Sequence, residues 1–314
     1  MAEFNASMIK ELRERTQAGM SDCKNALVEA GGDMEKAVEV ILKKGIVKAA
    51  ARAGKIAAEG EVRTLVSGNR GTIIEVNCQT DFVSRGDAFR EFVGKVLEVA
   101  SKLDEGADIG AQKYPGTDQP IETVRAEMVA KTGENTVIRR WDMLVCKEAG
   151  GLIHSYIHAG GRLAVLVEAH APSDAAAKNP KFVDFVDNVA MQIAAMSPIV
   201  VSKDKVQKGD VDKQREIFQA QMQEEKTAGT LKAPEAAWPK ILDGKLEKWF
   251  TEITLLGQDS VTTPGSSVDK VRQELGKELG GDVVISKFLR FGVGDGIEKV
   301  KDDLAEEVAK MTGG

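Results

Sequence analysis

The sequence predicts an α+β protein whose core is built twice, each half from a β-hairpin and the helix that follows it. Apolar and polar residues alternate on both sides of the turn Ser67–Gly71, and again around the turn Ala159–Arg162, which indicates two antiparallel hairpins. The third observation is a repeat. The motif F-x-x-F-V-x-x-V begins at Phe89 and recurs at Phe182, each time after a hairpin, so we expect a duplicated core.

Length and composition limit the class of protein. The chain has 314 residues, 42% of them hydrophobic, which suffices for two or three small cores or one large core with appendages. No apolar run reaches 18 residues and no leader follows Met1, so we expect a cytoplasmic protein without membrane contact. The net charge of -6 gives no support for nucleic acid as a partner. The three cysteines are far apart and odd in number, which favours reduced, buried thiols.

The N-terminal residues predict three short helices that must pack as one module. Ser7 and Asp33 are candidate caps for the first and third helices, and Gly31–Gly32 separates the second from the third. The basic residues from Lys43 to Lys55 have no acidic residue among them, so we expect a helical or flexible tether after this module.

Composition and periodicity then divide the chain. Residues 203–249 change to two polar helices joined by a Gly/Pro turn, which predicts a projecting antiparallel hairpin. Thr251–Leu256 and Val283–Val293 are expected to be strands, and Ile297–Met311 a charged closing helix. We therefore expect a three-helix module with its linker at 1–54, a core N-subdomain at 55–148, a core C-subdomain at 149–202 and 250–293, a helical hairpin insertion at 203–249, and a C-terminal helical module at 294–314.

A strand-to-helix connection is the strongest candidate for a functional site. A strand from Thr72 ends in polar residues, and Phe82 follows just before the helix that contains Phe89. Phe82 could be the first core residue under that helix or an exposed contact for a partner, since both are known roles of aromatic residues. The second repeat has no Thr-Asp-Phe-Val segment at its connection, which runs through Pro172–Asp174, and this asymmetry favours the exposed role.

Three stretches resemble bacterial elongation factor Ts, a family of nucleotide-exchange factors for the GTPase elongation factor Tu. Asn77–Val83 (N-C-Q-T-D-F-V) resembles the central signature of the family. Glu11–Lys24 resembles its ubiquitin-associated-like N-terminal module, and Phe288–Lys299 resembles its C-terminal signature. The resemblance implies a duplicated core with a helical hairpin that is used for self-association in some members. It therefore leaves a monomer, a homodimer or a heterotetramer with the GTPase open.

The resemblance also implies roles for individual residues. Thr80, Asp81, Phe82 and Val83 would form a wedge that enters elongation factor Tu beside its magnesium site, and Leu12, Arg13 and Met20 would grip the same partner. The context Ser-Tyr-x-His adds His158 as a further contact. For Leu12 the alternative is a core position, which apolar periodicity favours.

The residues do not indicate enzyme chemistry. Gly292, Gly294 and Gly296 lie between a strand and a predicted helix, but the third glycine falls one residue early for a dinucleotide fingerprint. His154 and His158 share one face of a predicted strand without further visible metal ligands. We therefore expect no catalytic, cofactor or metal site. The alternatives to an exchange factor are a protein-binding scaffold and, with less support, a small-molecule enzyme.

Overall fold

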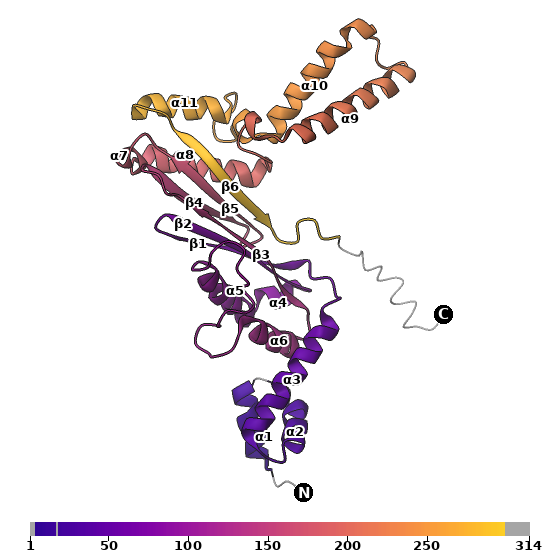
Figure 1. The fold of residues 1–314 in the computed structure, drawn as a ribbon, viewed down its shortest axis with the longest axis vertical. Coiled ribbons are helices and arrows are strands. Elements are labelled where there is room, and N and C mark those ends of the chain that lie inside the picture. Colours follow the sequence, from indigo (N-terminus) through magenta and orange to yellow (C-terminus); the bar gives the residue numbers. More distant parts are fainter. Residues whose placement is uncertain (1–3, 17, 299–314) are drawn as a thin grey trace.

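The computed structural model describes residues 4–16 and 18–298 of the chain. Figure 1 shows an elongated arrangement: a helical module at the N-terminal end, two sheets with their helices in the middle, and a helical hairpin that projects at the other end. Both sheets are antiparallel and three-stranded, with strand orders β1-β2-β3 and β4-β5-β6. The expected α+β class with a duplicated core is therefore confirmed.

The N-terminal module has three helices around a small apolar core. The helices are α1 (Ala6–Thr16), α2 (Met20–Glu29) and α3 (Met34–Arg52). Asp33 caps α3 by accepting a hydrogen bond from the backbone N–H of Lys36, as its position predicted. The core side chains are Leu12, Cys23, Ala26, Leu27 and Ala37.

The basic segment after this module is not a free tether. Helix α3 continues through it to Arg52, and its buried Ala49 packs against Ala126 and Val129 of the core. Lys44 and Lys48 pair with Glu29 and Asp22 of α2 at 2.6 and 2.9 Å. These acidic partners lie 15 and 26 residues away in the sequence, outside the basic run itself, so the sequence pattern does not show the pairing.

The first core unit is the expected hairpin and helix, completed by a third strand. Helices α5 and α6 contact the sheet, and the apolar core includes Ile74, Val76, Phe89 and Phe92. Its elements are β1 (Glu59–Ser67), β2 (Arg70–Cys78), α4 (Asp81–Arg85), α5 (Asp87–Ala100), α6 (Ile121–Thr132) and β3 (Thr136–Val145).

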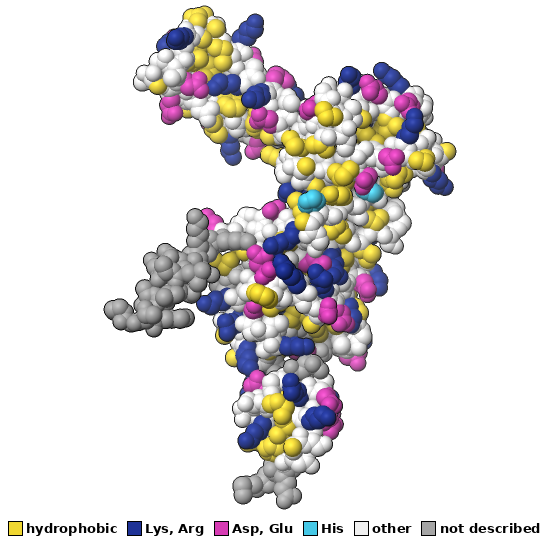
Figure 2. All heavy atoms as spheres, turned by 180° about the vertical axis from the view of Figure 1, so that it is seen from behind, with side chains coloured by type: hydrophobic (Ala, Val, Ile, Leu, Met, Phe, Trp, Pro, Cys, Tyr) yellow, Lys and Arg dark blue, Asp and Glu magenta, His cyan; other side chains and the backbone are white. Residues whose placement is uncertain are grey.

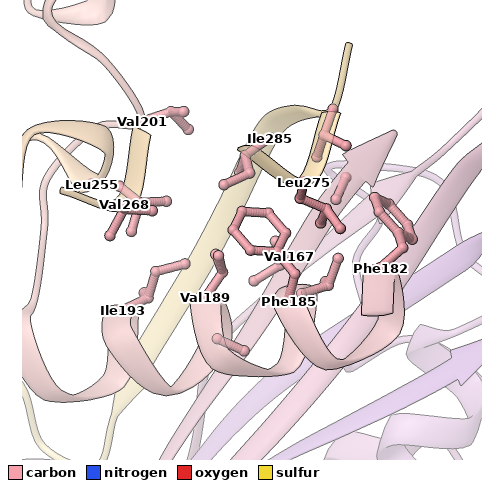
Figure 3. Close-up of a cluster of buried hydrophobic side chains, with 14 of the residues drawn as sticks. Val167, Phe182, Phe185, Val189, Ile193, Val201, Leu255, Val268, Leu275 and Ile285 are labelled. Carbon is pink, nitrogen blue, oxygen red and sulfur yellow. The ribbon is translucent and has the colours of Figure 1, made fainter. Parts of the chain in front are cut away.

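The second unit repeats this plan, again with three strands and three helices, and α11 takes the place before β6 that α6 has before β3. In Figure 3, Phe185 and Val189 of α8, Val167 of the sheet and Leu275 of α11 point into one apolar cluster. Helix α11 was not predicted, although Ser267 caps it and its apolar residues have helical spacing. The elements are β4 (Gly151–His158), β5 (Leu163–His170), α7 (Asp174–Ala177), α8 (Pro180–Met196), α11 (Val268–Leu279) and β6 (Val284–Gly292).

The two sheets pack against each other through a shared apolar layer. Gly71 of β2 makes this close approach possible, because a Cβ atom there would lie 2.5 Å from the side chain of Ile153 on β4. The side chains buried between the sheets are Val62, Ile73, Leu144, Cys146, Ile153, Ala164, Leu166 and Phe291.

The projecting hairpin consists of α9 (Lys208–Thr227) and α10 (Trp238–Ile253), flanked by the short 3₁₀ turns η1 (Lys203–Lys205), η2 (Glu235–Ala237) and η3 (Leu255–Gly257). It buries Met222, Leu242, Leu246 and Phe250. The strand expected at Thr251–Leu256 is wrong. Helix α10 runs to Ile253 because Leu246 and Phe250 continue its buried face. Thr251 and Ile253, whose β-branched side chains alternate as in a strand, therefore lie in the last turn of this helix.

The described chain ends in a turn that is tied to the first sheet. The N–H of Gly294 donates to Oε1 of buried Glu75 at 2.8 Å. Nearly all of the closing helix expected at Ile297–Met311 lies outside the described residues. In the part of the chain that is described, no helix has the length and apolar character needed to cross a membrane.

Candidate partner-binding site

Phe82 lies on the surface of the protein. Its side chain is 86% exposed, more than any other large hydrophobic side chain in the described ranges. Leaving so large an apolar surface in water is unfavourable, and isolated exposed aromatics of this kind are informative because most aromatic residues are largely buried. The core position that the sequence left open for Phe82 is therefore not the observed one.

A short capped helix directs Phe82 outward. Thr80 follows strand β2 by two residues and caps α4 by accepting a hydrogen bond from the backbone N–H of Val83. Ser84 is buried, and Val83 packs against the core of the first unit. Since consecutive residues of a helix point in different directions, a helix that turns Val83 and Ser84 inward leaves Phe82 facing solvent.

A turn that follows α6 clasps this helix at its base. Both carboxylate oxygens of Glu134 accept from Thr80, one from its hydroxyl at 2.7 Å and one from its backbone N–H at 3.0 Å. The next residue, Asn135, donates its backbone N–H to the side chain of Gln79 at 2.8 Å, and its amide donates to the carbonyl of Lys55 at 2.8 Å. The turn therefore connects the end of the α3 segment to the residues that position Phe82.

Neither Glu134 nor Asn135 was singled out in the sequence. The available signal was Gly133, which ends α6 in the left-handed conformation and so indicates a sharp turn at this point. Nothing in the sequence showed that this turn meets the residues before Phe82.

Asp81 lies at the edge of a hollow beside Phe82. Its carboxylate pairs with Arg85 at 2.9 Å. The hollow has a volume of about 220 Å³ and is also lined by Ala159, Gly160 and Arg162 of the second hairpin turn. The structure therefore brings the first repeat's connection and the second repeat's turn to one place.

The second repeat has the same capped helix without the aromatic residue. Ser173 caps α7 by accepting from the backbone N–H of Ala176, as Thr80 does for Val83. At the offset that relates Phe89 to Phe182, the residue equivalent to Phe82 is Ala175. The expectation that the second repeat lacks this segment is thus corrected: the helix is present in both repeats, and only the side chains differ.

Of the other residues expected to contact a partner, three are exposed and one is buried. Arg13 is exposed and Met20 is 51% exposed, and Figure 2 shows hydrophobic side chains on the surface of this module. Leu12 is fully buried in the module core, so its side chain has the core position that was the alternative and cannot reach a partner directly. His158 is exposed at the end of β4, where its Nδ1 lies 3.0 Å from the hydroxyl of Tyr156.

The glycine-rich turn and the histidine pair that could have indicated enzyme chemistry both have structural roles. Gly294 has a positive φ of 73°, and a Cβ atom there would lie 2.5 Å from the carbonyl oxygen of Ala58, so this glycine serves the turn that binds Glu75. His154 does not pair with His158 around a metal position, because its Nε2 lies 2.9 Å from Asp187 of α8.

The fold and this site define a class: an α+β protein that holds an exposed aromatic side chain on a rigid turn, as proteins that bind other proteins commonly do. A family model for elongation factor TS matches residues 79–295. An elongation factor Ts of Clostridium perfringens (strain SM101 / Type A) is 42% identical over 314 residues, covering 99% of each sequence. Those of Syntrophotalea carbinolica and Bdellovibrio bacteriovorus are 40% and 38% identical, again covering 99% of each. The chain belongs to the elongation factor Ts family.

Proposed function

We propose that this chain binds elongation factor Tu through the surface around α4 and that Phe82 drives the release of GDP. As a member of the elongation factor Ts family, it is a guanine-nucleotide exchange factor for elongation factor Tu in translation elongation. The single observation that carries the residue-level proposal is the 86% exposure of Phe82 on a helix that is capped and clasped at its base.

The proposed mechanism is a competition between two ligands of one GTPase. Phe82 would enter between the groups that hold the magnesium shell, while Asp81 makes polar contacts and Thr80 and Val83 keep the helix in place. The GDP phosphates would then lose the contacts that position them. By linkage, a factor that binds the nucleotide-free GTPase more tightly lowers the affinity for GDP by the same ratio. No covalent step and no cofactor are needed.

The remaining surfaces would support this contact. We propose that Arg13 and Met20 of the N-terminal module and His158 of β4 bind the same GTPase, with the segment 294–314 as a further anchor. We also propose that the protein acts in the cytoplasm, without nucleic acid, and that the α9–α10 hairpin is its surface for self-association, as a homodimer or within a heterotetramer with the GTPase.

The test is stopped-flow release of a fluorescent GDP from elongation factor Tu of the same organism. A packed aromatic anchor is typically worth roughly 2 kcal/mol or more, so Phe82→Ala should slow the accelerated release by about thirtyfold. Ile199→Ala is the matched control, because Ile199 is also strongly exposed, at 69%, and lies in the second unit after α8. This control should release GDP at the wild-type rate.

Three results would decide between the alternatives. Acceleration by the wild type that is lost in Phe82→Ala supports both the exchange activity and the wedge. Binding without acceleration would favour a scaffold role. Equal acceleration by wild type and Phe82→Ala would keep the exchange activity but reject the assignment of Phe82.

A further inference from the structure

A cluster of metal-binding side chains lies where the chain passes from the first sheet to the second. Cys146 and Glu148 belong to the connection between β3 and β4, and Glu168 and His170 are at the end of β5. Cys146, Glu168 and His170 bring ligand atoms within 4.8 Å of one another. Cys146 and His170 are both buried, with 4% and 9% of their surfaces exposed.

The two ring nitrogens of His170 have different surroundings. Its Nδ1 lies 4.0 Å from Sγ of Cys146 and 3.8 Å from Oε2 of Glu148. Its Nε2 lies 3.2 Å from Oε1 of Glu168. When the carboxylate of Glu168 accepts a hydrogen bond from the Nε2–H, the lone pair of Nδ1 is left facing Cys146 and Glu148. Metal-binding histidines are commonly oriented in this way.

Gly151 keeps space open beside these atoms. A Cβ atom at this position would lie 1.9 Å from Sγ of Cys146 and 3.3 Å from Nδ1 of His170. Any side chain on Gly151 would therefore displace the thiol. The close approach of the thiol and the imidazole depends on a residue that has no side chain.

The first unit has a different arrangement at the equivalent positions. The repeat offset places Glu75 and Asn77 where the second unit has Glu168 and His170. Asn77 donates to Glu75 at 3.0 Å, and two arginines neutralise the same carboxylate at 2.9 and 2.6 Å. In the second unit, the described contacts of Glu168 include no arginine, and a thiol and an imidazole take part instead.

We propose that Cys146, His170 and Glu148 form a binding site for a divalent zinc ion, with Glu168 as the residue that orients His170. Thiolate, imidazole and carboxylate together are a donor set that zinc accepts in proteins. Around a tetrahedral zinc ion, sulfur and nitrogen ligands lie about 3.6 Å apart, so the observed 4.0 Å separation needs only a small closure. Water would complete the coordination.

A bound ion would join the connection between the two sheets to strand β5. Cys146 and Glu148 come from the connection, and His170 is on the strand. Zinc would therefore hold the two core units together at this edge and would stabilise the folded chain in proportion to its occupancy.

The experiment is titration of the reduced full-length protein with Co²⁺ and with Zn²⁺. Cobalt bound to a thiolate gives a near-ultraviolet charge-transfer band, which zinc should abolish by displacement. We expect one equivalent to bind. Cys146→Ser should lose the band, and Glu168→Gln should keep it but weaken binding about 10- to 100-fold.

Cys23→Ser and Cys78→Ser are the matched controls, since both thiols are equally buried and lie in other cores. Both controls should keep the band, and zinc should raise the melting temperature of the wild type but not of Cys146→Ser. Equal zinc affinity of Cys146→Ser and wild type would overturn the proposal, as would loss of the band in Cys78→Ser. Absence of any thiolate band in the wild type would also overturn it.

Discussion

At the scale of single residues, the orientation of Phe82 depends on the carboxylate of Glu134. Its two oxygens accept from the hydroxyl and the backbone N–H of Thr80, the residue that caps α4. In Glu134→Gln only one of these acceptors remains, and a hydrogen bond to a charged group contributes about 1.5–3 kcal/mol. We expect a several-fold loss of exchange rate, measured by stopped-flow GDP release.

The control for this substitution is Glu105→Gln, because Glu105 is an exposed glutamate in the segment between α5 and α6. It should exchange like the wild type. If Glu134→Gln keeps the full rate while circular dichroism shows an unchanged fold, the clasp does not position Phe82 for exchange.

The sequence contained only part of this site. It placed Phe82 at a strand-to-helix connection but left its side chain either inside or outside, because periodicity cannot decide orientation at a junction where the period changes from 2 to 3.6. The inward packing of Val83 and Ser84 decides it. The contact of Glu134 with Thr80 could not be predicted, since the two residues are 54 positions apart and no local sequence pattern links them.

At the scale of elements, the helix α3 and its contact with α6 connect the N-terminal module to the core. Ala49 is 3% exposed at this contact, whereas its neighbour Ala50 is exposed. Ala49→Leu should separate the two helices and destabilise the protein by about 1–3 kcal/mol, as overpacking usually does. Because the same contact orients Arg13 and Met20 relative to Phe82, the affinity for elongation factor Tu should fall too.

Ala50→Leu makes the same change on the exposed side of the helix and should alter neither quantity. Chemical unfolding and titration of the GTPase measure the two effects. An Ala49→Leu protein with wild-type stability and affinity would show that the module is positioned in another way.

Element prediction from the sequence succeeded where one periodicity extended over many residues. The motifs at Phe89 and Phe182 correctly placed α5 and α8. It failed at Thr251–Leu256, where a helix ends among β-branched residues that also suit a strand. It left open whether the segment at the end of α3 is helical or flexible, because small residues such as Ala49 give no apolar stripe although they allow close helix contact.

At the scale of the whole molecule, Glu75 links the two core units. It is completely buried on β2, pairs with Arg139 and Arg140 of β3, and accepts from the N–H of Gly294 beyond β6. Burial by itself raises the pKa of Glu75, but the Gly294 N–H, the Asn77 amide and the two arginines outweigh it and hold the pKa below its ordinary value. The carboxylate is therefore ionised and bound in the folded chain.

The pH dependence of stability follows from this direction of the shift. As the pH falls below the ordinary value of about 4.5, the unfolded chain takes up a proton at Glu75 before the folded chain does. The contribution of Glu75 to the free energy of unfolding is therefore complete above that value. It is lost as the pH falls through the folded pKa.

Glu75→Gln tests this link between the two units. Removing one partner of a buried pair commonly costs 3–5 kcal/mol, and Arg139 and Arg140 are partly exposed, so we expect a loss of about 3 kcal/mol near neutral pH. The variant should also lose less stability than the wild type on acidification below pH 4.5. Urea unfolding near neutral pH and below pH 4.5 measures both effects.

Glu91→Gln is the control, because it removes the exposed pair with Lys95 and should change the free energy of unfolding little. If wild type and Glu75→Gln unfold alike at neutral pH, Glu75 does not hold the units together, and the apolar layer between the sheets suffices.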